Sequence, residues 1–142
     1  MPIYADISEA FAKMGYSNYF VPKPNKISGS AIFYKKDLFN LIEQSHFSFN
    51  ESSSQFLMFC KLQSLSSPTF EFIFAETHLK AKPEFMNDRI RQTLKIIQFF
   101  NENYQDLPVI LSGDFNEEPQ NKPISDIMES NFIDFYTMVR IQ

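Results

Sequence analysis

The sequence has little cysteine, little net charge and no long apolar run, and each shortage excludes a class of protein. A single cysteine, Cys60, excludes an internal disulfide framework and a zinc site built from cysteines. The formal net charge of -4 provides no general attraction to nucleic acid or to anionic membranes. No apolar segment approaches the roughly 18 to 20 residues of a membrane span, and the N-terminus lacks the layout of a signal peptide. We therefore expect a soluble, cytoplasmic protein, with mitochondria and the nucleus as alternatives.

Apolar residues, by contrast, are abundant. They make up 44% of the 142 residues, and 17 residues are Phe, which argues against disorder. A chain of this length is enough for one ordinary domain with its own core, so we treat residues 1–142 as a single domain. Cys60 lies in the apolar stretch FLMFCKL, as is typical of a buried small hydrophobic residue.

Short apolar segments predict strands at residues 31–34, 55–62, 69–79 and 109–112. The segment 55–62 is almost continuously apolar, which suits a strand that is covered on both faces. The segment 69–79 alternates, so Phe74, Glu76 and His78 share one of its faces. A short Ser/Pro turn joins these two segments, and it predicts an antiparallel hairpin.

Two helices are predicted between and before the strands. The first spans residues 6–14, is capped by Asp6 or Ser8 and ends at Gly15. The second spans residues 83–104 and has apolar residues at spacings of three and four. Its predicted apolar stripe is Met86, Ile90, Leu94, Ile97, Phe100 and Tyr104. Strands, helix and then strand again favour the α/β class with buried sheets.

Two polar residues follow the last predicted strand. Asp114 and Asn116 come directly after Gly113, and in an extended segment their side chains would point the same way. A carboxylate and a carboxamide in this arrangement can orient a water molecule, hold a hard cation such as Mg²⁺ and donate to a phosphate oxygen. Gly, Asp and Asn are also common turn residues, so a turn without chemistry is the alternative.

A histidine and a run of basic residues form the second candidate. A lone strand histidine such as His78 is either a catalyst or a satisfied core residue. Residues 80–95 contain five basic residues against two acidic ones, which suits a phosphate ligand but is also explained in part by the wet face of a helix. His78 and Asp114 both end predicted strands, where the loops of α/β folds form sites, so we expect them to converge on one pocket.

Four stretches in this order resemble the endonuclease/exonuclease/phosphatase superfamily: YFVPKPN, SGSAIFY, ETHLKAK and LSGDFNEEP. They are most similar to its branch of nocturnin, deadenylase and Angel proteins, and within that branch to nocturnin. Arg89 and Gln92 also follow the histidine at the family's distances. The resemblance covers nearly all of this chain but only the central part of the family's domain.

The resemblance implies a four-layer α/β sandwich that hydrolyses phosphoesters with Mg²⁺ as its cofactor. Asp114 would orient the attacking water and bind the metal. Asn116 would bind the metal or the scissile phosphate. His78 would donate a hydrogen bond to a nonbridging phosphate oxygen as negative charge builds there.

Basic residues at positions that lie near phosphate in the family are Lys23, Lys80, Lys82 and Arg89. Lys82 stands where the family has Arg, which exchanges a bidentate fork for a point charge. The three lysines favour the 2'-phosphate of NADP(H) as the substrate. The 3' end of poly(A) RNA is the alternative, although no stripe of aromatic and basic residues for stacking bases is evident.

The family has two further site residues outside the region that this chain matches. A Glu before it is the principal metal ligand, and a His after it completes the site. This chain has neither, and its other histidine, His46, precedes the motifs. We therefore expect a domain that is incomplete at both ends, poorly stable because sheet edges are left unpaired, and weakly active or inactive.

Two other interpretations stay open. The chain is either a catalytically silent module of the same fold that binds a phosphate or nucleotide, or an unrelated α/β protein whose turns mimic the motifs. In every case we expect no membrane partner and no stable protein partner.

Overall fold

The computed structural model describes residues 2–24, 26–50, 54–118 and 120–129. The chain forms two compact units. The first comprises Met1–His78 and Leu107–Gly113, and the second comprises Leu79–Asp106 and Asp114–Gln142. None of the described helices combines the length and the apolar character that crossing a membrane requires.

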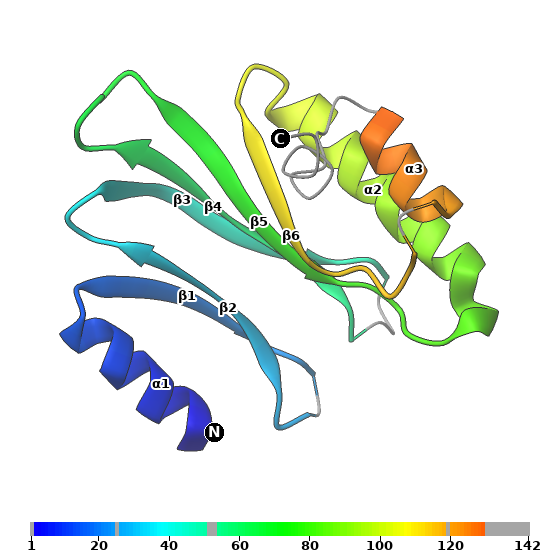
Figure 1. The fold of residues 1–142 in the computed structure, drawn as a ribbon, viewed down its shortest axis with the longest axis horizontal. Helices are drawn as coiled ribbons and strands as arrows, with labels where there is room; N and C mark the ends of the chain where they lie inside the picture. Colours follow the sequence, from blue (N-terminus) through cyan, green and yellow to red (C-terminus); the bar gives the residue numbers. More distant parts are fainter. Residues whose placement is uncertain (1, 25, 51–53, 119, 130–142) are drawn as a thin grey trace, which may run out of the picture. The chain divides into compact units, whose positions relative to one another are not determined.

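The first unit contains a helix and two sheets (Figure 1). Its elements are α1 (Pro2–Lys13), β1 (Tyr16–Pro22), β2 (Gly29–Lys35), β3 (Phe39–Ser48), β4 (Phe56–Ser64), β5 (Glu71–His78) and β6 (Val109–Asp114), the last residue of which belongs to the second unit. Strands β1 and β2 form an antiparallel hairpin. The other four strands form one sheet in the order β3-β4-β5-β6.

Strand directions within the larger sheet follow from the hydrogen bonds. β3, β4 and β5 are antiparallel, so the predicted hairpin of the two Phe-rich segments is confirmed. β6 runs parallel to β5. The Ile73 N–H donates to the Pro108 carbonyl at 2.9 Å and the Ser112 hydroxyl donates to the Ala75 carbonyl at 3.1 Å, so residue numbers rise together along both strands.

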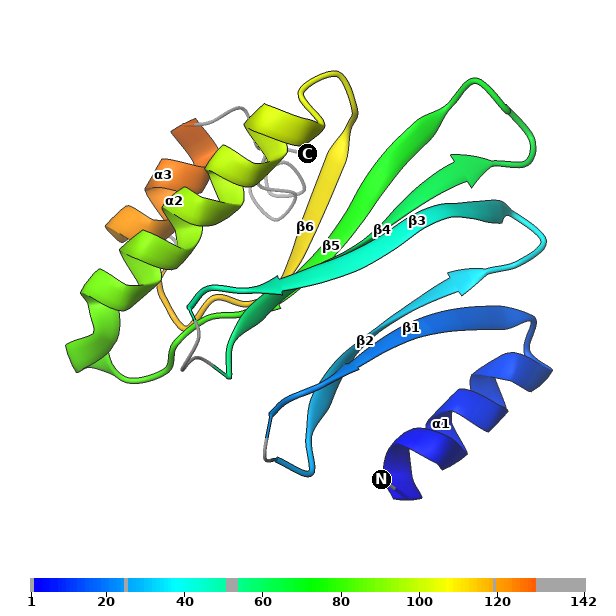
Figure 2. The same cartoon turned by 180° about the vertical axis from the view of Figure 1, so that it is seen from behind.

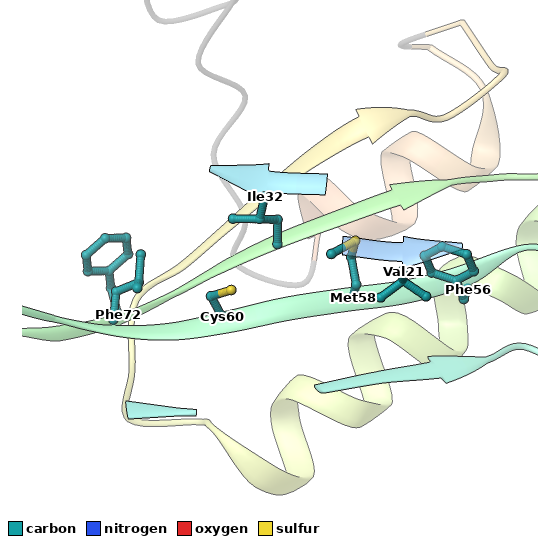
Figure 3. Close-up of a cluster of buried hydrophobic side chains, with 7 residues drawn as sticks. Val21, Ile32, Phe56, Met58, Cys60 and Phe72 are labelled. Atoms are coloured by element: carbon teal, nitrogen blue, oxygen red, sulfur yellow. The ribbon is translucent and has the colours of Figure 1, made fainter. Parts of the chain in front are cut away.

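The core of the first unit lies between its two sheets. Val21 and Ile32 from the hairpin face Phe56, Met58 and other buried side chains of β4 and β5 (Figure 3). Five consecutive residues of β4, from 56 to 60, are buried, which confirms a strand that is covered on both faces. Cys60 is fully buried as predicted, and burial raises the pKa of its thiol to about 12.

Helix α1 packs on the β1–β2 hairpin through aromatic rings. Tyr4 stacks on Phe20 with ring centroids 4.0 Å apart, and Phe11 contacts Phe33 at 4.6 Å. The helix ends before Gly15, as predicted, and this glycine has a φ of 83°.

The predicted start of α1 and its predicted caps are wrong. The helix starts at Pro2 instead of residue 6, so Asp6 and Ser8 lie inside it. Proline suits the first turn of a helix, where its missing N–H costs nothing. The Ser8 hydroxyl accepts a hydrogen bond from the Asn18 amide at 2.9 Å, which is a contact between α1 and β1 and not a cap.

Strands β1 and β3 had no counterpart among the predicted elements. β3 is exposed along most of its length, and β1 is only partly buried. A mainly exposed strand carries polar residues on both faces, so its sequence lacks the apolar alternation on which strand prediction depends.

The second unit contains η1 (Pro83–Phe85), α2 (Met86–Asn103) and α3 (Lys122–Glu129), with α2 and α3 side by side (Figure 2). The predicted long helix is confirmed in extent, although its first turn is a 3-10 turn.

The predicted apolar stripe of α2 is only partly right, since Phe100 is buried as predicted. Met86 and Leu94 are exposed at 38% and 51%. The residues of α2 that are buried are Arg89, Gln92, Thr93, Ile96 and Phe100. The buried face is rotated because the polar side chains of Arg89 and Gln92 are taken inside to bond the chain segment that precedes η1.

Candidate active site

Lys23 and His78 meet in the first unit. Lys23 follows β1, and its Nζ lies 3.3 Å from Nδ1 of His78 at the end of β5. A lysine ammonium only donates, so Nδ1 is the acceptor and the proton of the neutral imidazole is carried on Nε2. His78 is therefore held in the tautomer that a donor to a phosphate oxygen requires.

Glu76 lies close to Lys23 and Ser30, and the sequence analysis did not single it out. It shares a face of β5 with His78, and it accepts a hydrogen bond from Ser30. Burial raises the pKa of its carboxyl group, and the Ser30 hydroxyl and the Lys23 charge oppose that rise. Among the described residues its Oε2 has no hydrogen-bonding partner. The strand alternation already placed Glu76 beside His78, and that was the available signal.

Asp114 and Asn116 form a turn, which corrects the extended segment that we predicted. The Asn116 N–H donates to Oδ1 of Asp114 at 2.9 Å, and Asn116 has a φ of 51°. This is an Asx turn, so the turn geometry that we weighed against a site is present. It occupies one carboxylate oxygen of Asp114 and is compatible with chemistry at the same residues.

Two further hydrogen bonds tie this turn to the chain that follows β5. The Asn116 side-chain amide donates to the Leu79 carbonyl at 3.0 Å. The Leu79 N–H donates to the Asp114 carbonyl at 2.9 Å. The carboxamide is therefore oriented by its nitrogen, which fixes the direction of its oxygen as well.

Gly113 is required by its surroundings in the first unit. It has a φ of 139°, and an added Cβ would lie 1.8 Å from the Thr77 carbonyl oxygen. No side chain fits at that distance, so only glycine lets β6 approach β5 in this way. The glycine of the GDFN motif thus has a structural reason of its own.

Lys80 and Lys82 lie in a short segment before η1. The Lys80 ammonium stands over the Phe85 ring, 4.6 Å from its centroid, and the Lys80 N–H donates to the Gln92 side chain at 3.0 Å. Lys82 is exposed and has a φ of 78° and a ψ of 143°, a conformation that favours glycine. Both ammonium groups are thus carried by a backbone that is held in a defined shape.

Arg89 has partners other than the phosphate that we predicted for it. It is 2% exposed, and it pairs with Glu117 at 2.7 Å from Nη2. Its Nη1 donates to the carbonyl oxygens of Lys80 and Lys82 at 2.9 and 2.7 Å. A phosphate-binding role for Arg89 stays a prediction, and these contacts favour a structural one.

The other arginine of the basic run is a surface residue. Arg91 pairs with Asp88 at 2.6 Å, and the two side chains are 67% and 38% exposed. Arg91 therefore belongs to the solvent-exposed face of the helix, as one of the two interpretations predicted. The basic residues 80–95 do not form a single cluster.

Glu117 is a buried acidic residue that the sequence analysis did not single out. Its side chain is 7% exposed. A hydrogen bond from the Asn121 amide at 2.6 Å and the Arg89 guanidinium lower the pKa of its carboxyl group. No local pattern around Glu117 signals this pairing, since its partner lies 28 residues earlier in the chain.

Asp114 and Asn116 were also the predicted metal ligands. They offer a carboxylate and a carboxamide, both oxygen donors of the kind that Mg²⁺ prefers, and Mg²⁺ often uses only one or two protein carboxylates together with waters and substrate phosphate. No group of three or more His, Cys, Asp or Glu side chains suited to a metal occurs in the described part of the chain. The two residues fit as part of a magnesium site.

The structure thus brings the predicted site residues together in two sets. The first unit holds Lys23 and His78, and the second holds Lys80, Lys82, Arg89, Asp114 and Asn116. The convergence of His78 and Asp114 on one pocket stays a prediction.

The chain is similar to known proteins in sequence and in fold. No family model matches the chain. It is 32% identical to nocturnin of Drosophila melanogaster over 130 residues, which are 80% of this chain and 20% of that protein. It is 29% identical over 134 residues to a probable CCR4-Not complex 3'-5'-exoribonuclease subunit Ccr4 of Enterocytozoon bieneusi, covering 73% of this chain and 28% of that protein.

The solved structures agree with the sequence relatives. The human nocturnin catalytic domain with bound sulfate anion superimposes with a TM-score of 0.77 at 25% identity, covering 84% of this chain and 49% of that chain. The chain therefore spans about half of that solved domain and less than a third of the two curated relatives. The predicted α/β class and superfamily fold are confirmed. Over most of its length, this chain belongs to the endonuclease/exonuclease/phosphatase superfamily and is nocturnin-like within it.

Proposed function

We propose that this chain is a Mg²⁺-dependent phosphoester hydrolase of the nocturnin type. The observation that carries the proposal is the Lys23–His78 contact, which keeps the imidazole proton on Nε2. The relatives support the class of reaction, since one is named a 3'-5'-exoribonuclease and the human nocturnin domain binds sulfate, a tetrahedral anion like phosphate.

Each proposed role follows from the chemistry of one side chain. His78 donates from Nε2 to a nonbridging oxygen of the scissile phosphate. Asp114 accepts a hydrogen bond from the attacking water and so orients it. Asn116, oriented through its bond to Leu79, presents its carboxamide oxygen. A magnesium ion held by Asp114 and Asn116 would supply positive charge opposite the phosphate.

Lys23, Lys80 and Lys82 are the proposed phosphate-binding residues. Three point charges suit a compact phosphate group, and for this reason we propose the 2'-phosphate of NADP(H) as the substrate ahead of the 3' end of poly(A) RNA. Phe85 supports this assignment of Lys80, because the ring holds the ammonium group without neutralising it.

The direct test is to supply the chain with Mg²⁺ and either NADP⁺ or a short oligo(A). We expect phosphate release from NADP⁺, and a fall of roughly a hundredfold or more in its rate in His78→Asn and in Asp114→Asn. His46→Asn is the matched control, because His46 on β3 pairs with the hydroxyl of Tyr19 on β1 and has no proposed role. If AMP is released from oligo(A) and no phosphate is released from NADP⁺, the dinucleotide is excluded as the substrate.

We also propose that the chain by itself turns over slowly, because it spans only part of its relatives. Its rate is to be compared with that of the human nocturnin catalytic domain under the same conditions. Equal rates would contradict this part of the proposal.

A catalytically silent binding module is the second candidate. The observation in its favour is that the Asp114 carboxylate accepts the Asn116 N–H in an Asx turn, as in turns of purely structural role. This candidate predicts that NADP⁺ raises the melting temperature equally with and without Mg²⁺. Phosphate release that is lost in Asp114→Asn would rule it out.

A further inference from the structure

The second unit contains a buried ion pair. The side chains of Arg89 on α2 and Glu117 are 3% and 7% exposed. Nε and Nη2 of Arg89 approach the same carboxylate oxygen at 2.8 and 2.7 Å. The other oxygen of Glu117 accepts from the Asn121 amide at 2.6 Å. Both partners are therefore satisfied, as a buried ion pair must be if it is not to destabilise the fold.

This pair joins two segments that carry predicted site residues. One is the lysine segment (residues 79–82), whose carbonyls at 80 and 82 accept both bonds from Nη1 of Arg89. The other is the aspartate segment (residues 114–118), which contains Glu117 itself. A single guanidinium group thus reaches both segments from α2, and it does so with the planar fork that only arginine provides.

Further hydrogen bonds run directly between the same two segments. Leu79 bonds to Asp114 through the backbone and to Asn116 through the side-chain amide. Gln92, one turn along α2 from Arg89, accepts from the Lys80 N–H. The ion pair is thus part of a connected network, and such networks hold their members more firmly than separate bonds do.

The backbone strain of the described chain falls in these segments. Lys82 and Asn116 are the non-glycine residues with positive φ among the described residues. Such conformations persist only where the surroundings impose them. The carbonyl of Lys82 accepts from Arg89, and the side chain of Asn116 is fixed by Leu79, so both strained residues are restrained by this network.

We infer that Arg89 and Glu117 are positioning residues, whose buried pair locks the lysine segment to the aspartate segment and so fixes Lys80, Lys82, Asp114 and Asn116. The consequence for turnover rests on the proposed phosphoesterase function. The structural half does not, because it concerns only the order of the two segments.

A direct contact between Arg89 and substrate phosphate is the competing role, and the two roles predict different behaviour of Glu117. If Arg89 binds phosphate, removal of the Glu117 charge strengthens that contact or leaves it unchanged. If Arg89 positions the segments, Glu117→Gln and Arg89→Gln give the same defect. The double variant is then no worse than the more defective single variant, because both act through one contact.

The first experiment measures hydrogen–deuterium exchange of single amides by NMR. In Arg89→Gln, in Glu117→Gln and in the double variant we expect exchange at Leu79, Lys80 and Asn116 to become faster by about tenfold or more, with no change along β4 and β5. The double variant keeps the test valid if a single variant fails to fold, because it leaves no unpaired buried charge.

The matched control is the neighbouring exposed pair on the same helix. Arg91→Gln and Asp88→Asn make the same changes of charge type, and the two side chains are 67% and 38% exposed, against 3% and 7% for Arg89 and Glu117. We expect neither variant to alter exchange in the two segments or turnover, because solvent screens exposed pairs.

The second experiment measures hydrolysis of NADP⁺ by the same variants and by Arg89→Lys. We expect turnover to fall by roughly a hundredfold in all of them. Arg89→Lys is included because a lysine keeps the charge that a phosphate needs but cannot hold Glu117 and two carbonyls together. High turnover in Arg89→Lys or in Glu117→Gln would overturn the inference.

The two experiments separate the inference from the proposed function. Unchanged exchange in the double variant overturns the inference whatever the activity. Faster exchange with normal turnover overturns it as well, because the order of the segments then does not matter to catalysis. If the unaltered chain hydrolyses neither NADP⁺ nor oligo(A), the proposed function fails, and exchange alone decides whether the pair orders the segments.

Discussion

Single residues explain much of the spacing in the motifs. Gly113 must be glycine, because a Cβ there would overlap the Thr77 carbonyl oxygen. His78 at the end of β5 is contacted by the Lys23 ammonium group. Glu76 adds a half-buried carboxyl group to the face of β5 that carries His78. Each of these residues has a physical constraint that is separate from any catalytic role.

Gly113→Ala should destabilise the protein by at least about 2 kcal/mol, because the new Cβ would overlap the Thr77 carbonyl and the φ of 139° disfavours any side chain. Gly15→Ala is the matched control. Gly15 also has a positive φ, but no atom lies within 4 Å of an added Cβ, so its cost should be about 1 kcal/mol. Chemical denaturation measures both, and equal costs would mean that the close approach is not rigid.

Glu76→Gln should change how stability depends on pH. Burial raises the folded-state pKa of Glu76 above its unfolded value, so its favourable contribution is complete below the unfolded pKa and is lost as pH rises through the folded pKa. Glutamine does not titrate. The free energy of unfolding of the variant should therefore gain on that of the unaltered protein as pH rises through this range, and a constant difference would contradict the burial argument.

At the scale of residues, the sequence predicted which side chains to examine but not their partners. His78, Asp114 and Asn116 stand out because polar residues interrupt apolar strands. Glu117 does not stand out, because its environment is created by an arginine on a helix 28 residues away. Contacts of that kind depend on how the chain turns between the two positions, and no local pattern records it.

At the scale of elements, predictions succeeded where apolar residues dominate. The continuous run of β4 and the alternation of β5 gave the hairpin correctly. Helix α2 was predicted in extent but only partly in orientation, because Phe100 of the predicted stripe is buried whereas Met86 and Leu94 are exposed. The assumption that buried means apolar fails when two polar side chains are fully bonded inside.

The corrected orientation of α2 can be tested with two alanine substitutions. Ile96 is fully buried, and Ile96→Ala should lower the free energy of unfolding by about 2–4 kcal/mol. Leu94 is 51% exposed, and Leu94→Ala should change it by less than about 1 kcal/mol. Urea unfolding followed by circular dichroism provides both values. A larger loss at Leu94 would restore the stripe that the spacing alone predicted.

At the scale of the whole molecule, the fold class followed from motif order, and the superimposition on the human nocturnin domain confirms it. Two curated relatives are 29% and 32% identical to the chain over most of its length. Composition and periodicity by themselves gave only the α/β class. They do not specify a superfamily, because many α/β folds bury sheets of similar composition.

A ligand that binds only the folded state should raise the free energy of unfolding of the chain. At about 100 times its Kd, NADP⁺ should raise the free energy of unfolding by about 2.7 kcal/mol. Lys80→Gln together with Lys82→Gln should reduce this gain at the same concentration, because the proposed phosphate contacts are lost. Lys36→Gln, an exposed lysine next to β2, should leave it unchanged. A gain that survives loss of both lysines would remove them from the proposed site.

At position 82, the residue that gives the highest thermal stability differs from the residue that the proposed phosphate site needs. A lysine there adopts angles that glycine tolerates better, so Lys82→Gly should raise the melting temperature while it removes an ammonium group from the candidate phosphate site. Directed evolution for thermal tolerance alone would drift towards glycine at this position. Selection for turnover would restore the lysine, and a library screened both ways would show which demand has shaped the residue.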